Sequence, residues 1–223
     1  MNRKTALAPG EFYHVYNRGV DKRPIFLDAA DYKRFVNILF FCNGGMSVNM
    51  RELTRNLSKG GSLVDFIEIR GKTFVDIGAY CLMPNHFHLL MHEKVENGIT
   101  LFLKKLCTAY SMYFNTKYKR TGKLFERAFS SEHADTDQYL KYLFSYIHLN
   151  PAKLIEPNWK DRESIDRSRI NAFVENYTFS SYRNYLGEKE YSEILNAEPF
   201  PKYFEDYGMK EEIVEWLDFA KQP

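Results

Sequence analysis

The sequence predicts an α+β fold, in which strands and helices alternate within one main domain. Two observations support this prediction. Short segments with the two-residue apolar alternation of strands are separated by longer segments with the three- and four-residue apolar spacing of helices. The chain has 223 residues and is 44% hydrophobic and 16% aromatic. A chain of this size and composition can bury a sizeable core, which excludes a disordered protein.

The first part of the chain supplies a strand, a helix and a polar insertion. Residues 12–18 alternate apolar and polar side chains and end at a glycine, which predicts a strand. Asp28 is a suitable N-cap for a helix over residues 28–41, whose apolar side chains lie along one face. Residues 43–62 are polar and interrupted by glycine pairs, so we expect a surface insertion there. Residues 63–69 again favour a strand.

A pair of strands and two long helices follow. We expect strands over residues 73–82 and 86–91, a helix over 98–118, an extended segment over 124–133 and a helix over 137–149. Pro84 and Asn85 separate the two strands by a tight turn. Asp135 or Thr136 is placed to cap the last helix. That helix ends before Pro151, because proline disfavours helical geometry in the residue that precedes it.

Several features exclude whole classes of protein. No apolar stretch approaches the roughly 18–20 residues of a membrane span, and the N-terminal residues lack the apolar core of a secretory signal. Cys42, Cys81 and Cys107 are widely spaced and form no CxxC motif, which is typical of buried, reduced thiols rather than disulfides or zinc ligands. We therefore expect a cytoplasmic protein with no membrane partner.

The segment around His86 and His88 is the most informative part of the chain. On a strand, side chains two residues apart share one face, so these imidazoles lie side by side while Phe87 and Leu89 point into a core. Two adjacent neutral imidazoles form half of a metal site. Because such a pair is often incidental, its interpretation depends on a second group of residues.

That second group lies on the predicted helix over residues 137–149. Tyr139, Tyr142 and Tyr146 recur at helical spacing, and we interpret the first two as core residues. Tyr146 differs because Asn150, one turn later, is a polar residue at a helix end. An amide oxygen is a suitable third ligand for a hard ion such as Mg²⁺ or Mn²⁺.

Charge is unevenly distributed along the chain, although the net charge is only +2. Residues 104–127 are rich in lysine and arginine, and Glu126 is their only acid, whereas acids outnumber lysines in residues 187–218. The basic segment can follow a phosphate backbone, with its interleaved tyrosines and phenylalanine stacking on bases. The alternative is a solvated helix face with the aromatic residues in the core.

Five motifs follow one another between residues 10 and 186. They are GEFYHVYNRG at 10–19, YCLMPNHFHLL at 80–90, RTGKLFERAF at 120–129, YIHLNP at 146–151 and SSYR at 180–183. In these motifs the chain resembles the REP-associated tyrosine transposases, a branch of the single-tyrosine HUH transposases that act on single-stranded DNA. HUH denotes two histidines around a bulky hydrophobe, here His86, Phe87 and His88. The insertion at 43–62 departs from the pattern of that family.

The resemblance implies a ferredoxin-like (RRM-like) antiparallel sheet flanked by helices, with a C-terminal helical extension. It implies a transposase domain over residues 1–186. Residues 187–223 carry no motif of that family, and we expect an acidic, partly helical tail there. It assigns the nucleophile to Tyr146 and the ligands of Mg²⁺ or Mn²⁺ to His86, His88 and Asn150. We expect DNA contacts from Arg18, Lys117, Lys119, Arg120, Lys123 and Arg127.

The implied reaction is metal-assisted transesterification through a 5′-phosphotyrosine, in which DNA is cleaved and rejoined at hairpin-containing sites. The implied partner is single-stranded or hairpin DNA, with REP-like palindromes among the candidates. We expect a monomer or homodimer that acts in the cytoplasm at the nucleoid.

Two alternatives remain at this stage. One is a DNA- or RNA-binding module on the same fold that no longer cleaves, against which the intact set of His86, His88, Tyr146 and Asn150 argues. The other is a zinc-dependent hydrolase that uses His86, His88 and His92. It is the weaker alternative, because a leucine intervenes on that face.

Overall fold

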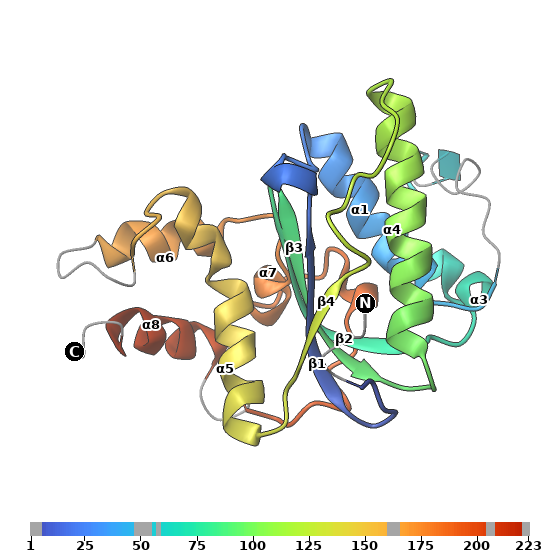
Figure 1. The fold of residues 1–223 in the computed structure, drawn as a ribbon. Coiled ribbons are helices and arrows are strands. Elements are labelled where there is room, and N and C mark those ends of the chain that lie inside the picture. Colours follow the sequence, from blue (N-terminus) through green and yellow to red (C-terminus); the bar gives the residue numbers. More distant parts are fainter. Residues whose placement is uncertain (1–5, 47–54, 57–58, 160–165, 204–207, 220–223) are drawn as a thin grey trace.

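A four-stranded antiparallel sheet lies at the centre of the structure, a computed structural model that describes residues 6–46, 55–56, 59–159, 166–203 and 208–219. The strands are β1 (Phe12–Arg18), β2 (Val75–Met83), β3 (His86–Glu93) and β4 (Ser130–His133), in the spatial order β2–β3–β1–β4 (Figure 1). All neighbouring strands in this sheet are antiparallel. The predicted α+β fold, an antiparallel sheet flanked by helices, is confirmed.

Helices cover both faces of this sheet. Helices α1 (Ala29–Cys42) and α4 (Gly98–Lys117) pack on one face, and α5 (Asp137–His148) packs on the other against β2 and β3. The shorter elements are η1 (Val20–Lys22), η2 (Leu63–Phe66), α3 (Ile67–Arg70), η3 (Asn150–Leu154), α6 (Arg167–Glu175), α7 (Tyr182–Tyr185), η4 (Ser192–Ile194) and α8 (Met209–Phe219). Helices α6 and α8 lie on the α5 side, away from α1 and α4 (Figure 1).

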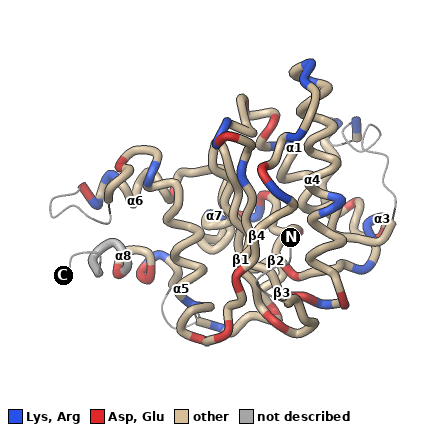
Figure 2. The backbone as a smooth tube through the Cα atoms, viewed as in Figure 1, with Lys and Arg blue, Asp and Glu red and all other residues tan. Residues whose placement is uncertain are grey.

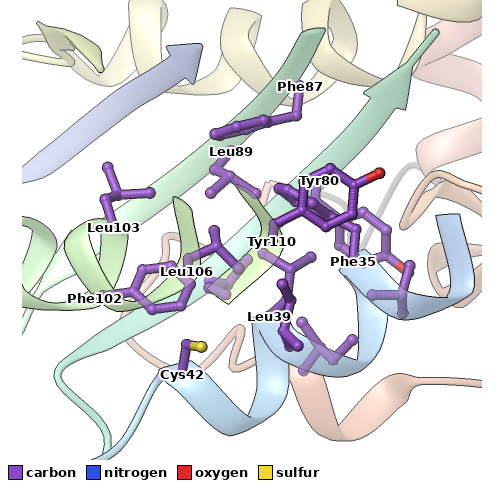
Figure 3. Packing of buried hydrophobic residues seen from close by; sticks show 14 of the residues in the cluster. Phe35, Leu39, Cys42, Tyr80, Phe87, Leu89, Phe102, Leu103, Leu106 and Tyr110 are labelled. Carbon is purple, nitrogen blue, oxygen red and sulfur yellow. The ribbon is translucent and has the colours of Figure 1, made fainter. Parts of the chain in front are cut away.

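The sheet divides the core into two clusters. Phe87 and Leu89 of β3 pack into the first cluster with Phe35 of α1 and Tyr110 of α4 (Figure 3). Leu90 of β3 belongs to the second cluster, on the side of α5. Successive side chains of β3 therefore enter opposite clusters, as strand geometry requires.

The predicted N-caps of two helices are present. Oδ1 of Asp28 accepts a hydrogen bond from the Asp31 N–H at 3.0 Å, and Oγ1 of Thr136 accepts one from the Tyr139 N–H at 3.2 Å. These bonds satisfy backbone donors that have no partner within the helix. Helix α5 ends at His148, and η3 continues the chain with a proline in its first turn.

The prediction of a strand over residues 63–69 is wrong. These residues form η2 and the start of α3. Ser62 accepts a hydrogen bond from the Val64 N–H at 3.4 Å, while Asp65 accepts one from the Ser62 N–H at 2.8 Å, so the two side chains cap the first turn reciprocally. Leu63 and Phe66 are buried one turn apart, and this packing outweighs the β-branched and aromatic content that favoured a strand.

The predicted extended segment over 124–133 is a strand only in its last part, β4. Before β4, the side-chain amide of Asn17 donates hydrogen bonds to the carbonyls of Arg127 and Ala128, at 2.9 and 2.8 Å. Here the side chain of Asn17 takes the place of the backbone hydrogen bonds that pair β1 with β4. Phe125 makes an isolated bridge to Gly19.

The segment beyond residue 186 contacts the face of α5. Phe200, Met209 and Ile213 are buried in the second cluster, and Lys141 of α5 pairs with Glu212 of α8 at 2.9 Å. The division of the chain at residue 186 stays a prediction. Residues 47–54 and 57–58 of the predicted insertion lie outside the described residues.

The three cysteines are free thiols, with Cys42 and Cys81 buried and Cys107 partly buried. Within the part of the chain that the structure describes, no helix is both long enough and apolar enough to cross a membrane.

Candidate active site

Strand β3 holds His86 and His88 side by side on the sheet face that packs against α5. Their ring centroids are 5.0 Å apart, with the ring planes nearly perpendicular at 87°. Phe87, between them in the sequence, points into the opposite cluster (Figure 3). The two-residue spacing therefore places both imidazoles on one face, as expected.

Each of these imidazoles has its Nδ1 atom in a hydrogen bond. Nδ1 of His86 lies 2.6 Å from Oδ1 of Asn85, and because an amide oxygen only accepts, Nδ1 carries the proton. Nδ1 of His88 lies 2.9 Å from Nε2 of His14. Burial lowers the pKa of His86 to about 4 and lowers the pKa of His88 well below its ordinary value. Both rings are therefore neutral at pH 7, which is the form that binds a metal ion.

Helix α5 brings Tyr146 to these rings. The centroid of Tyr146 lies 5.7 Å from that of His88 and 5.6 Å from that of His14, in edge-on contacts. Burial raises the pKa of Tyr146, and the neighbouring Tyr142 and Glu132 raise it further. The phenol is therefore protonated at neutral pH, and its oxygen becomes a good nucleophile only where positive charge stabilises it.

Asn150 is buried and hydrogen-bonded on both sides of its amide. Its Nδ2 donates to the Tyr146 carbonyl at 2.9 Å, and its Oδ1 accepts from Lys153 Nζ at 3.2 Å. Lys153 Nζ also lies 5.4 Å from the centroid of the Tyr146 ring. The structure thus brings Asn150 next to Tyr146, but its oxygen contacts an ammonium group and does not line the cleft described next.

The two histidines and the tyrosine line a cleft of about 530 Å³. Its lining residues are Tyr16, Asn17, Arg18, Lys22, Asn85, His86, His88, Glu126, Arg127, Ser130, Tyr146 and Lys153. Basic side chains outnumber the carboxylate of Glu126, which is itself paired with Arg18. The cleft therefore has the electrostatic character of an anion-binding site.

The basic residues predicted to bind DNA occupy different environments. Arg18 and Arg127 line the cleft, and Lys123 lines a neighbouring hollow of about 460 Å³ that shares Glu126 and Arg127 with it. Lys117 differs, because its Nζ lies 2.8 Å from Asp28 and 2.7 Å from Asp31.

Lys119 and Arg120 lie in the turn after α4, where Figure 2 shows basic residues at the end of the helix. The guanidinium of Arg120 lies 5.5 Å from the centroid of the Phe114 ring.

Sequence reasoning assigned no role to three residues at this site. His14 contacts His88 and Tyr146, Glu132 lies beside His14, and Lys153 contacts Asn150. One signal was available for Lys153, which lies seven residues after Tyr146 and so returns to the same side when η3 continues α5. No local pattern points to His14 or Glu132, because they meet only when β1 pairs with β4.

The donor set fits a weakly held divalent ion. His86 and His88 are neutral imidazoles that face one cleft, and each has a second ring nitrogen besides the Nδ1 that is hydrogen-bonded. Among the described residues, no group of three His, Cys, Asp or Glu side chains is arranged to hold a metal on its own. A bound ion would therefore take its other ligands from the amide of Asn150, from water or from phosphate oxygens.

His92, the third histidine of the zinc-hydrolase alternative, lies away from this pair. Its Nδ1 is 3.0 Å from Oδ2 of Asp76, and Leu90 separates it from His88 on the strand.

Residues 64–150 match the family model described as "Transposase IS200 like". Over these residues the chain is similar to the IS200-like transposases. The matched span contains His86, His88, Tyr146 and Asn150, and the match supports a transposase-type, DNA-binding function.

The chain is also similar to a solved structure described as a REP-associated tyrosine transposase bound to a REP hairpin. The TM-score is 0.51 and the sequence identity is 11%, over 84% of this chain and 86% of that chain. That likeness confirms the fold. No curated protein sequence matches the chain.

Proposed function

We propose that this protein is a transposase that cleaves and rejoins single-stranded DNA through a covalent link to Tyr146. The observation that supports the proposal is the meeting of Tyr146 with His86 and His88 in one basic cleft. A hydroxyl nucleophile, neutral metal-binding imidazoles and cationic side chains are together the groups that transesterification of a phosphodiester requires.

In the proposed reaction, Oη of Tyr146 attacks a DNA phosphorus. The Oη–P bond forms as the P–O3′ bond breaks, which leaves a 5′-phosphotyrosine and a 3′-hydroxyl. The proton of the phenol passes through solvent to the released 3′-oxygen. Because the covalent link keeps the energy of the phosphodiester, a second 3′-hydroxyl reverses the step and joins strands without ATP.

The residues around Tyr146 have distinct proposed roles. His86, His88 and Asn150 would hold Mg²⁺ or Mn²⁺, and Asn150 would do so after its Oδ1 exchanges Lys153 for the ion. When bound, a divalent ion supplies positive charge to the phosphate oxygens. Arg18 and Arg127 bind the flanking phosphates, and Lys153 places a further positive charge beside the phenol.

We propose hairpin-containing single-stranded DNA as the substrate. The similar solved structure is described as bound to a REP hairpin, and this supports the choice. A short palindrome therefore serves as the first probe. The alternative is a module on the same fold that binds DNA without cleaving it.

The decisive experiment compares Tyr146→Phe with Tyr142→Phe. Both substitutions remove one hydroxyl and keep the ring, and the two residues lie one turn apart on α5. Labelled hairpin DNA and Mn²⁺ are incubated with each protein. The covalent adduct is read as a denaturant-resistant shifted band, and the linked residue is mapped by mass spectrometry.

We expect the wild type and Tyr142→Phe to capture DNA, and Tyr146→Phe to bind it without capture. A phosphate mapped to Tyr142 or Tyr139 would refute the assignment of the nucleophile while keeping the reaction class. Tight binding by the wild type with no adduct on any hairpin would favour the non-cleaving module.

A further inference from the structure

A series of polar contacts leads from the exposed Glu132 of β4 through the buried His14 to the histidine pair. His14 of β1 is 3% exposed and lies between Glu132 of β4 and His88 of β3. Its Nε2 is 2.9 Å from Nδ1 of His88, and the two rings stack at 19° with centroids 5.1 Å apart. Its Nδ1 is 3.7 Å from Oε2 of Glu132. The cleft lining includes neither His14 nor Glu132, so both act on the cleft through the lining residues that they contact, among them His88.

Glu132 is held in place by two phenols. Oε1 accepts a hydrogen bond from the Tyr16 hydroxyl at 3.0 Å, and Oε2 accepts one from the Tyr139 hydroxyl at 3.1 Å. The nearby imidazole of His14 and these two hydroxyl groups lower the pKa of Glu132 to about 2. The side chain is therefore a carboxylate at neutral pH. Because Tyr139 belongs to α5, the same contacts also attach the helix of Tyr146 to the sheet.

The carboxylate determines where the protons of the two histidines lie. A lone pair on Nδ1 of His14 would face Glu132 at 3.7 Å with electrostatic repulsion, whereas an N–H there is attracted. A neutral ring with its proton on Nδ1 accepts at Nε2. His14 Nε2 then accepts the hydrogen bond from the Nδ1–H of His88, and the lone pair of His88 is placed on Nε2.

We infer that Glu132 and His14 are positioning residues that hold His88 in the Nδ1–H tautomer, with its Nε2 lone pair presented as a metal ligand. Outer hydrogen-bond partners of this kind fix the tautomer and the ring orientation of metal-binding histidines. The inference deepens the proposed function and rests on it, since it takes His88 as a ligand.

The first test is the tautomer of His88 in the metal-free protein, measured at pH 8 by long-range ¹H–¹⁵N NMR correlation of the imidazoles. At that pH an ordinary imidazole is neutral. We expect the Nδ1–H form of His88 in the wild type and a shift toward the Nε2–H form in His14→Phe. An Nε2–H form of His88 in the wild type would overturn the inference whether or not the enzyme cleaves DNA.

The second test is the affinity for Mn²⁺ alone, measured by calorimetry without DNA. We expect Glu132→Gln and His14→Phe to bind Mn²⁺ about 10-fold more weakly than the wild type, and His88→Ala to bind it more weakly still. His14→Gln should recover most of the affinity, because its side-chain oxygen can accept from the Nδ1–H of His88. If His14→Gln is as weak as His14→Phe, lost packing is the cause and the inference fails.

A matched control is available between the residue just before β1 and the last residue of β4. Glu11 and His133 form a Glu–His contact of 2.8 Å near the surface, remote from the cleft lining. Glu11→Gln makes the same change of charge as Glu132→Gln and should leave the Mn²⁺ affinity unchanged.

The outcomes separate the two proposals. If His88→Ala weakens Mn²⁺ binding while Glu132→Gln and His14→Phe do not, the metal site stands and the inference is overturned. If His88→Ala has no effect on Mn²⁺ affinity, the proposed metal site itself fails, and the inference fails with it.

Discussion

At the scale of single residues, the site depends on positive charge beside a buried phenol. Burial raises the pKa of Tyr146, and the neighbouring imidazoles are neutral, so neither stabilises a phenolate. Lys153 is a cation placed next to the ring, and it also contacts Asn150. Its charge therefore bears on both the nucleophile and the proposed metal ligand.

Replacing Lys153 should reveal this role. We expect Lys153→Met to slow covalent capture of DNA by the order of 100-fold, because one preorganised charge is lost where negative charge develops. Hairpin binding should weaken far less, since Arg18 and Arg127 remain in the cleft. Single-turnover capture and a binding isotherm measure the two effects. Lys153→Arg is the control that keeps the charge, and an equally slow Lys153→Arg would point to steric packing instead.

The histidine pair makes a second prediction at this scale. We expect His86→Ala to abolish cleavage and to keep hairpin binding, and we expect wild-type cleavage to require added Mg²⁺ or Mn²⁺ and to stop with EDTA. Two neutral imidazoles and an amide bind such ions weakly, which makes the ion easy to remove. His92→Ala, on the same strand face but bound to Asp76, is the control and should cleave normally. Full cleavage after exhaustive chelation would exclude the metal role.

At the scale of elements, α5 is tied to the sheet by a buried hydrogen-bond network at its C-terminal end. Nε2 of His148 lies 2.8 Å from Oγ of Ser181, and that oxygen also accepts from the Tyr80 N–H at 2.8 Å. His148 is fully buried. Through this contact the YIHLNP and SSYR motifs anchor each other against β2.

The pH dependence of stability should report this network. Burial lowers the pKa of His148 to about 3, whereas the unfolded chain takes up the proton near the ordinary value of 6.5. The contribution of His148 is therefore fully present above pH 6.5 and is lost as the pH falls toward 3. We expect His148→Gln, which keeps a hydrogen-bonding group and does not titrate, to reduce the loss of unfolding free energy between pH 7 and 4. Urea unfolding at several pH values measures it, and an unchanged pH dependence would contradict the assignment.

At the scale of the whole molecule, basic residues from distant segments form one surface. The cleft and the neighbouring hollow share Glu126 and Arg127. The surface that they form therefore runs without a break from the end of β1 to the loop after α4. Lys117 belongs to the same basic stretch of sequence, but its ammonium is paired with Asp28 and Asp31 at the start of α1.

The salt dependence of DNA binding should distinguish these lysines. Each phosphate contact contributes a slope of about −0.7 to the dependence of log K on log salt for a single strand. Lys123→Ala should make the slope shallower by about that amount. Lys117→Ala should leave the slope unchanged and lower the thermal stability, because it leaves the buried Asp31 without its ammonium partner. A shallower slope for Lys117→Ala would show that this lysine also binds DNA.

Much of the fold and part of the site follow from local patterns. Three predictions depend only on residues close in sequence, and the structure agrees with each. They are the placement of His86 and His88 on one strand face, the helix that carries Tyr146, and the caps at Asp28 and Thr136. The two-residue period of a strand and the 3.6-residue period of a helix are properties of single elements. They can therefore be read from the sequence without knowledge of tertiary contacts.

The tertiary structure decided what depends on pairing between distant segments. Residues 63–69 became helical because a capping box and the burial of two side chains prevailed over strand propensity. Lys117 is paired with Asp28 and Asp31, which lie nearly ninety positions earlier. Likewise, only the register of β1 with β3 and β4 brings His14 between His88 and Glu132. Such contacts are set by the packing of whole elements, and no local period in the sequence encodes them.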